Sequence, residues 1–166
     1  MLRARQIKLV LTDNDGVLTD TGVYYSAEGE IMKRFSIRDG MGVELLRKDG
    51  VETGIITGEL SESIAKRAEK LKIQHLHQGI KEKTDCLTGI LESTGLTESE
   101  IAYIGDDVND ITIMNRIYPL GITAAPADAM PVIQEMVHYV CAAPGGHGAF
   151  RDFADFLLDL RIEGSL

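Results

Sequence analysis

Two aspartates separated by one residue follow the first apolar stretch of the chain. Asp13 and Asp15 lie in the segment LTDNDGV, where Gly16 comes directly after the second of them. Side chains at positions i and i+2 of an extended segment point the same way, so one carboxylate can attack phosphorus while the other transfers protons. The alternative is an acidic turn that only ends a strand.

A second polar segment, IITGE, follows another apolar stretch and contains Thr57, Gly58 and Glu59. The Thr57 hydroxyl and the amides of this turn can hold phosphate oxygens, assisted by the N-terminus of a helix expected to begin at Ser61. The plainer interpretation is a Thr-Gly turn in which Ser61 caps the helix.

The most acidic segment is GDDVND, with four polar side chains among five positions: Asp106, Asp107, Asn109 and Asp110. Oxygen ligands grouped around a small site suit Mg²⁺, which retains waters and accepts few carboxylates. A helix N-cap is the competing explanation and is worth ~1 kcal/mol, but a cap accounts for only one of the three aspartates.

A single lysine completes the group of candidate catalytic residues. Lys83 lies in the segment GIKEK, at the start of an expected helix, from which its ammonium can reach a phosphate. A lone lysine at such a position is usually solvated, so its significance depends on the residues around it.

The elements that must position these groups alternate between short apolar runs and amphipathic stretches, the pattern of an α/β domain. Strands followed by helices at this spacing predict right-handed crossovers and a parallel sheet, in one domain spanning 1–166. Ligands of such sheets bind beyond the carboxyl ends of the strands. The expected strands are 7–11, 53–56, 75–77, 102–104, 120–123 and 138–140; the expected helices are 41–48, 61–71, 81–93, 108–116, 131–136 and 149–160.

One segment interrupts the alternation. Residues 22–26 and 30–36 contain tyrosine, valine and phenylalanine and flank a glycine turn at 27–29, which predicts a β-hairpin. A two-stranded ribbon alone is marginal in water, so the hairpin requires a partner, either its own sheet or another subunit.

The net charge of −9 and the absence of a lysine or arginine tract disfavour nucleic acid and anionic membrane surfaces as partners. No apolar run approaches the ~20 residues of a spanning helix. Cys86 and Cys141 have neither metal-binding nor redox spacing, which fits a reducing compartment. These features predict a cytoplasmic protein.

An aspartate pair, a threonine, a lysine and an acidic loop, in this order at successive strand ends, resemble the haloacid dehalogenase superfamily along nearly the whole chain. Asn14 is an unusual middle residue of the first motif. The small size and the hairpin resemble the capless, tetrameric branch that includes 3-deoxy-D-manno-octulosonate 8-phosphate phosphatases and nine-carbon ulosonate 9-phosphate phosphatases. Further matches are the segments at 38–40, 78–79 and 145–151. The resemblance implies a three-layer Rossmann-like parallel sheet with helices on both faces, a hairpin inserted after the first strand, and no cap domain.

The same resemblance implies the roles of the candidate residues. Asp13 is the nucleophile that forms an aspartyl-phosphate, and Asp15 is the general acid and then the base. Mg²⁺ is bound by Asp13, the backbone carbonyl of Asp15, and Asp106. The phosphoryl oxygens are bound by Thr57 and Lys83. The outer-shell groups around the metal are Asp107, Asn109 and Asp110.

The sugar-acid substrate is harder to assign. In octulosonate phosphatases an arginine generally follows the Thr-Gly motif, whereas this chain has Glu59. We expect Gly58 and Glu59 to face the substrate. At ~100° per residue, a helix that contained Glu59, Arg67 and Lys70 would project all three side chains within roughly 80° of one another. This arrangement resembles the nine-carbon branch and favours a nonulosonate 9-phosphate, with Arg67 or Lys70 at the substrate carboxylate. The alternative substrate is an eight-carbon ester. The alternative role of Arg67 and Lys70 is that of solvated charges on the helix surface.

An open, capless site predicts that a neighbouring subunit supplies a missing wall. The resemblance implies a homotetramer formed through the 22–36 hairpin, with the glycine-rich segment and Arg151 near an adjacent site. The segment at 145–148 can equally be the N-terminal turn of the last helix.

Two other classes compete with a phosphatase. A response-regulator receiver domain also forms a phospho-aspartate with Mg²⁺, but it lacks a second acid at the position of Asp15, and in this chain the acidic loop follows the lysine, the wrong order for a receiver. A non-catalytic relative is disfavoured because every expected catalytic side chain is present.

Overall fold

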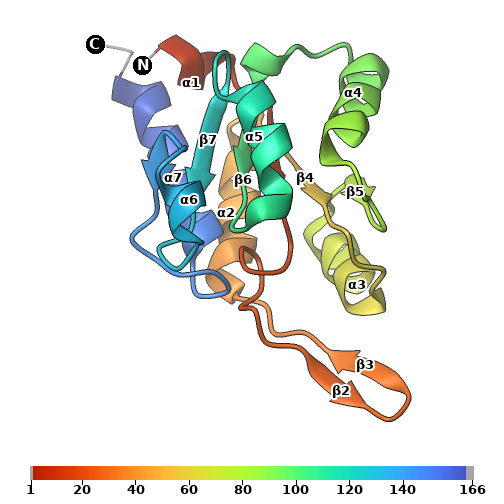
Figure 1. Cartoon of the computed structure of the whole chain (residues 1–166). Coiled ribbons are helices and arrows are strands. Elements are labelled where there is room, and N and C mark those ends of the chain that lie inside the picture. Colours follow the sequence, from red (N-terminus) through yellow and green to blue (C-terminus); the bar gives the residue numbers. More distant parts are fainter. Residues whose placement is uncertain (1, 164–166) are drawn as a thin grey trace.

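The computed structural model describes residues 2–163, which form a six-stranded parallel sheet in the order β5-β4-β1-β6-β7-β8. Helices cover both faces of this sheet (Figure 1), which confirms the predicted three-layer architecture. The strands are β1 (Leu9–Thr12), β4 (Glu52–Ile56), β5 (His75–His77), β6 (Ile101–Ile104), β7 (Ile122–Ala125) and β8 (Tyr139–Val140).

Alternation along the central strands divides the buried side chains between two cores. Val10 faces one core, whereas Leu9 and Leu11 face the other, as the twofold period of a strand requires. The first core is covered by α1 (Leu2–Gln6), α2 (Ile37–Lys48), α3 (Glu62–Leu71) and α7 (Ala149–Glu163). The second is covered by α4 (Lys83–Thr94), α5 (Ile111–Ile117) and α6 (Pro131–Gln134).

Strand β1 is the topological switch point of the sheet. It pairs with β4 on one side and with β6 on the other, because the chain builds outward to β5 and then returns to the far side of β1. A crevice forms where the connections leave such neighbouring strands in opposite directions. The segments that follow β1, β4 and β6 therefore meet at one edge of the sheet.

The hairpin β2 (Tyr24–Ser26) and β3 (Gly29–Met32) forms a two-stranded sheet of its own and projects away from the body (Figure 1). Both strands are shorter than predicted: residues 22–23 and 33–34 lie outside the two-stranded ladder, and Phe35 forms only an isolated bridge with Thr19. Five of its large apolar side chains are exposed: Val23, Tyr24, Tyr25, Ile31 and Met32.

Several element boundaries differ from those predicted. Helix α1 was not predicted. Helix α2 begins four residues earlier than expected because the Ser36 side chain caps it and accepts a 3.1 Å hydrogen bond from the Arg38 amide. Helix α4 begins at Lys83 rather than at residue 81. The predicted helix 108–116 is a 3₁₀ turn, η2 (Val108–Asp110), followed by α5. Strand β7 begins at Ile122 because Leu120 lies exposed in the preceding turn.

Within the described residues, every helix is too short or too polar to cross a membrane.

Candidate active site

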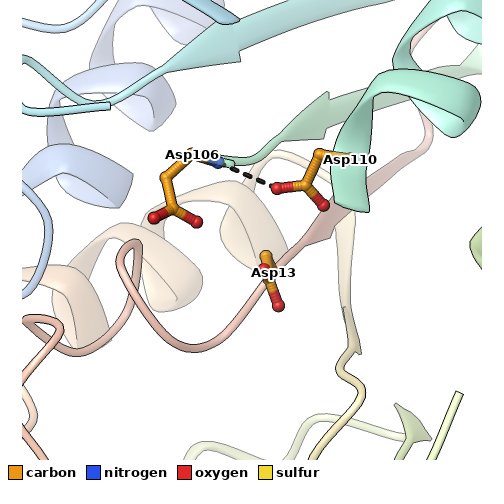
Figure 2. A group of neighbouring side chains, drawn as sticks. All are labelled: Asp13, Asp106 and Asp110. Atoms are coloured by element: carbon orange, nitrogen blue, oxygen red, sulfur yellow. Dashed lines mark hydrogen bonds between the residues drawn. The ribbon is translucent and has the colours of Figure 1, made fainter. Parts of the chain in front are cut away.

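Three carboxylates converge at the carboxyl end of β1 and β6. Asp13 directly follows β1, Asp106 lies two residues beyond β6, and Asp110 ends η2. One oxygen from each lies within 4.8 Å of the other two, and Figure 2 shows the three side chains approaching one another from these segments. The predicted meeting of residues 13 and 106 at one site is therefore present.

Lys83 lies beneath this cluster as the first residue of α4, with its side chain 2% exposed. Its ammonium is 3.1 Å from Asp13 Oδ2 and 2.6 Å from Asp110 Oδ1, and it donates to the Tyr103 hydroxyl at 3.2 Å. Burial alone would lower the pKa of Lys83, but the neighbouring carboxylates of Asp13 and Asp110 raise it above its ordinary value. Lys83 is thus a permanent positive charge at the carboxylate that is predicted to be the nucleophile.

Asp110 holds this arrangement together through both of its oxygens. Oδ1 accepts hydrogen bonds from Lys83 and, at 2.6 Å, from the Tyr103 hydroxyl. Oδ2 accepts from the backbone amides of Asp106 at 2.9 Å and Asp107 at 3.4 Å. Because its lone pairs are engaged in this way, Asp110 orients Lys83 and the loop that carries Asp106.

The electrostatics of the cluster suit a divalent cation. Burial, followed by repulsion from Asp110, raises the pKa of Asp13 to about 7 although Lys83 opposes the shift. Burial and the carboxylates of Asp13 and Asp110 raise the pKa of Asp106 to about 8. Oδ1 of Asp106 is buried and has no hydrogen-bond partner among the described residues. A cation between Asp13 and Asp106 would relieve the repulsion and satisfy this oxygen, so the residues fit Mg²⁺.

Asp15 lies on the same loop and faces a different set of partners. Its Oδ1 accepts hydrogen bonds from Lys33 at 2.7 Å, Thr19 at 3.2 Å and the Asn14 side chain at 3.3 Å. Its Oδ2 is buried and has no partner among the described residues. The two carboxylates of the first motif therefore have separate environments, Asp13 with Lys83 and Asp15 with Lys33.

A cavity of about 320 Å³ opens over these groups. Thr57, Gly58 and Glu59 form part of its wall, and the Thr57 hydroxyl accepts a 3.2 Å hydrogen bond from the Glu59 amide. Six of the lining side chains are acidic: Asp13, Asp15, Glu30, Glu59, Asp106 and Asp107. Among the described residues, Lys33 is the one cationic side chain that lines the cavity.

Asp107 and Asn109, predicted as outer-shell residues, line the rim of this cavity. Both are exposed, and the Asp107 carboxylate accepts a 2.7 Å hydrogen bond from the Val108 amide at the start of η2. The helix-cap explanation therefore applies to Asp107 and in part to Asp110, which accepts from the Asp107 amide in a capping box, and it does not account for Asp106.

Three predicted substrate-binding residues lie outside the cavity of their own chain. The Arg67 guanidinium donates to the Ser36 carbonyl at 2.8 Å, Lys70 is exposed on α3, and Arg151 pairs with Asp155 at 2.8 Å. The predicted common helical face of Glu59, Arg67 and Lys70 is wrong, because α3 begins at Glu62 and Glu59 belongs to the preceding turn. The predicted role of Arg67 or Lys70 at the substrate carboxylate and that of Arg151 near an adjacent site stay predictions.

The glycine-rich segment packs against the catalytic loop as well as preceding α7. The Gly146 amide donates to the Val17 carbonyl at 2.9 Å, and a Cβ on Gly145 would overlap the carbonyl of Gly16. Gly16 has φ +89°, and a Cβ there would overlap the Asp106 carboxylate. Glycine at 16 and 145 therefore permits the close approach of three backbone segments that places Asp106 beside Asp13.

Sequence reasoning missed three residues that contact the predicted catalytic groups: Lys33 and Thr19 at Asp15, and Tyr103 at Lys83. Tyr103 is fully buried within β6, and a tyrosine in an apolar strand signals that its hydroxyl has a buried partner. Lys33 directly follows the hairpin strand β3, and its side chain is 1% exposed. No local pattern in the sequence indicates its partner.

No protein-family model matches the chain. Individual proteins, however, are similar to it in sequence. It is 36% identical over 158 residues to the 3-deoxy-D-manno-octulosonate 8-phosphate phosphatase KdsC of Escherichia coli (strain B / BL21-DE3), an alignment that covers 95% of this chain and 82% of KdsC.

Solved structures agree with this similarity. The same phosphatase from Moraxella catarrhalis, in complex with a magnesium ion, a phosphate ion and a KDO molecule, matches with a TM-score of 0.90 at 32% identity, covering 99% of this chain and 92% of that one. The cobalt-bound phosphatase from Haemophilus influenzae matches with a TM-score of 0.91 at 34% identity, covering 98% and 94%.

Proposed function

The chain belongs to the 3-deoxy-D-manno-octulosonate 8-phosphate phosphatase family, and from that premise we propose that it is a Mg²⁺-dependent phosphatase acting on an eight-carbon ulosonate 8-phosphate. The observation that carries the proposal is the convergence of Asp13, Asp106 and Lys83, with Asp15 on the same loop. This set combines a nucleophile, a metal site, a fixed positive charge and a second acid.

The eight-carbon ester is preferred to the nine-carbon ester suggested by Glu59. The similar proteins are named for the eight-carbon substrate, and the helical arrangement of Glu59 with Arg67 and Lys70 is not present. Glu59 still lines the cavity, where it can accept hydrogen bonds from the hydroxyls of either sugar.

In the proposed reaction, a carboxylate oxygen of Asp13 attacks phosphorus while the bond between phosphorus and the sugar oxygen breaks. Asp15 gives its proton to the departing oxygen, which leaves the sugar as an alcohol and the phosphoryl group on Asp13. The Asp15 carboxylate then takes a proton from water as the water oxygen attacks phosphorus and the bond between phosphorus and the Asp13 oxygen breaks. This step restores the Asp13 carboxylate and the protonated Asp15 and frees phosphate.

The remaining residues reduce the repulsion between two anions. Lys83⁺ lies 3.1 Å from Asp13 Oδ2 and can pair with an equatorial phosphoryl oxygen, while Thr57 in the cavity wall can donate to another. Asp13, Asp106 and the carbonyl of Asp15 would hold Mg²⁺, which when bound neutralises charge on the phosphoryl group.

A homotetramer formed through the 22–36 hairpin belongs to the same proposal. Its support is the exposed apolar surface of the hairpin, which includes Tyr24, Tyr25 and Ile31, and the shortage of positive charge in the cavity for a substrate that carries two anionic groups. Sedimentation at micromolar concentration tests it, and a fully active monomer would contradict it.

The function is tested by phosphate release in the presence of Mg²⁺ from the eight-carbon 8-phosphate, a nine-carbon ulosonate 9-phosphate and glucose 6-phosphate. We expect the highest kcat/KM on the first and no turnover by Asp13→Asn, with the circular dichroism spectrum unchanged. A clear preference for the nine-carbon ester would refute the substrate assignment. An active, folded Asp13→Asn variant would refute the mechanism.

A further inference from the structure

The hairpin forms one wall of the cavity above the carboxylates. Thr21, Val23 and Tyr25 alternate along β2 and the segment that leads to it, and all three line the cavity. Glu30, which lies opposite Tyr25 in the two-stranded ladder, lines it as well. Alternate residues of an extended segment, and residues directly opposite each other across a ladder, point to the same side. One face of the hairpin is therefore turned toward the cavity.

The other face of the hairpin is turned away from it. Tyr24 pairs with Met32 in the ladder, and neither of these two side chains lines the cavity. The two neighbouring tyrosines are nevertheless similarly exposed, Tyr24 at 56% and Tyr25 at 68%. Of these two accessible rings, Tyr25 is thus the one that faces the groups proposed to carry the chemistry.

Two sets of polar contacts hold this wall in place. Glu30 accepts a hydrogen bond of 2.5 Å from the Ser61 hydroxyl, just before α3. Lys33, which follows β3, donates to Asp15 at 2.7 Å and lies 3.3 Å from Glu30. Because the Lys33 side chain is 1% exposed, these contacts are shielded from water and fix the strand opposite Tyr25. The ring is therefore presented on a positioned wall rather than on a free loop.

The chemistry of the lining indicates what this wall can contact. Among the described residues that line the cavity, Val23 and Tyr25 are the two with large apolar side chains, and the others are polar or charged apart from Gly58. A sugar has apolar surface where its carbon-bound hydrogens lie, and an aromatic ring can cover that surface while its hydroxyl stays in water. The hairpin wall is therefore the part of the cavity that suits the carbon skeleton of a sugar.

We propose that Tyr25 is a specificity-determining residue whose ring packs against the carbon skeleton of the sugar acid. This inference rests on the proposed phosphatase function. At ~3.3 Å per residue, Tyr25 lies roughly 13 Å along the wall from Thr21, so it reaches the part of the substrate that is remote from phosphorus. Binding energy from such remote contacts raises kcat/KM, because it is used to orient the reacting group. A phosphate ester too short to reach Tyr25 does not gain this contact.

Glycerol 3-phosphate is the short ester that isolates this contact. Like the eight-carbon 8-phosphate, it has a primary alcohol as its leaving group, so the demands of the step at phosphorus are matched. It lacks the carbons that would lie along the wall. The experiment measures kcat/KM with Mg²⁺ on both esters for the unmodified chain, Tyr25→Ala, Tyr25→Phe and Tyr24→Ala, and compares the sedimentation of the four proteins.

We expect Tyr25→Ala to lose at least ~tenfold in kcat/KM on the eight-carbon ester and less than about threefold on glycerol 3-phosphate. Tyr25→Phe keeps the ring and should retain most of the preference for the longer ester. The matched control is Tyr24→Ala, which removes the neighbouring ring on the other face of the hairpin. Any loss that it causes should be equal on the two esters.

Equal losses by Tyr25→Ala on the two esters, or no loss on either, would overturn the inference and leave the phosphatase function standing. So would an unmodified chain with equal kcat/KM on both esters. An unmodified chain that hydrolysed neither would refute the proposed function, and the role of Tyr25 with it.

If Tyr25→Ala does not fold, or sediments differently from the unmodified chain, Tyr25→Leu provides the second test. Leucine keeps an apolar side chain but lacks a flat ring, so the same selective loss on the eight-carbon ester is expected at smaller size. A Tyr25→Leu variant without this selectivity would then overturn the inference.

Discussion

Without a divalent ion, the ionised carboxylate of Asp13 should destabilise the folded chain. Burial and the Asp110 carboxylate raise the pKa of Asp13 from 3.8 to about 7. Between these values the folded state binds more protons than the unfolded state, so the free energy of unfolding falls as pH rises from about 4 to about 7. Each pKa unit corresponds to ~1.4 kcal/mol, which sets an upper limit of roughly 4 kcal/mol for the loss at pH 8.

Asp13→Asn removes this charge while preserving the size of the side chain. In EDTA at pH 8 we expect the variant to be more stable than the unmodified chain by about 1–3 kcal/mol, less than the limit because the buried cluster can relax and admit water. At pH 4 the two proteins should have nearly equal stability, since Asp13 is then largely protonated when folded. The assay is urea unfolding followed by circular dichroism at pH 4, 6 and 8.

Mg²⁺ should offset this difference in stability. At one hundred times its dissociation constant, an ion that binds only the folded state adds ~2.7 kcal/mol, and Asp13→Asn should lose most of this gain. The matched control is Asp159→Asn, an exposed aspartate on α7, which should change neither the pH dependence nor the Mg²⁺ effect. The reasoning is refuted if the unmodified chain in EDTA is equally stable at pH 4 and pH 8 and Asp13→Asn does not raise its stability.

Three further substitutions test the geometry. Lys83→Met leaves Asp13 and Asp110 without their shared cation, so we expect a loss of about 3–5 kcal/mol in urea unfolding and no measurable phosphate release; near-normal turnover would exclude its role. Gly16→Ala forces the Asp106 carboxylate to move. The Mg²⁺ concentration that gives half-maximal activity should therefore rise at least ~tenfold, and an unchanged value in a Mg²⁺ titration would show that Asp106 is not a ligand. Tyr103→Phe removes a donor to Asp110 and should cost about 1–3 kcal/mol of stability, and a thermally neutral variant would contradict the importance of that hydrogen bond.

The chemistry of the site was predictable from the sequence because a parallel sheet brings its strand ends to one edge. Asp13, Thr57 and Asp106 each follow a short apolar run, and the rule that ligands bind beyond the carboxyl ends of strands places all three at one cavity without knowledge of any contact. Local periodicity likewise indicated the alternation of strands and helices, because each depends only on residues a few positions apart.

The tertiary structure alone decided which charged groups meet. Lys33 and Asp15 are 18 positions apart, and Lys83 and Asp110 are 27 apart, so their contacts depend on how the hairpin and the crossovers fold back rather than on any local pattern. The separation of Glu59 from Arg67 was decided in the same way, by the residue at which α3 begins. The sequence thus determined which functional groups are available, and the folding of distant segments onto one another determined their partners, because an ion pair between segments leaves no periodic signal in either.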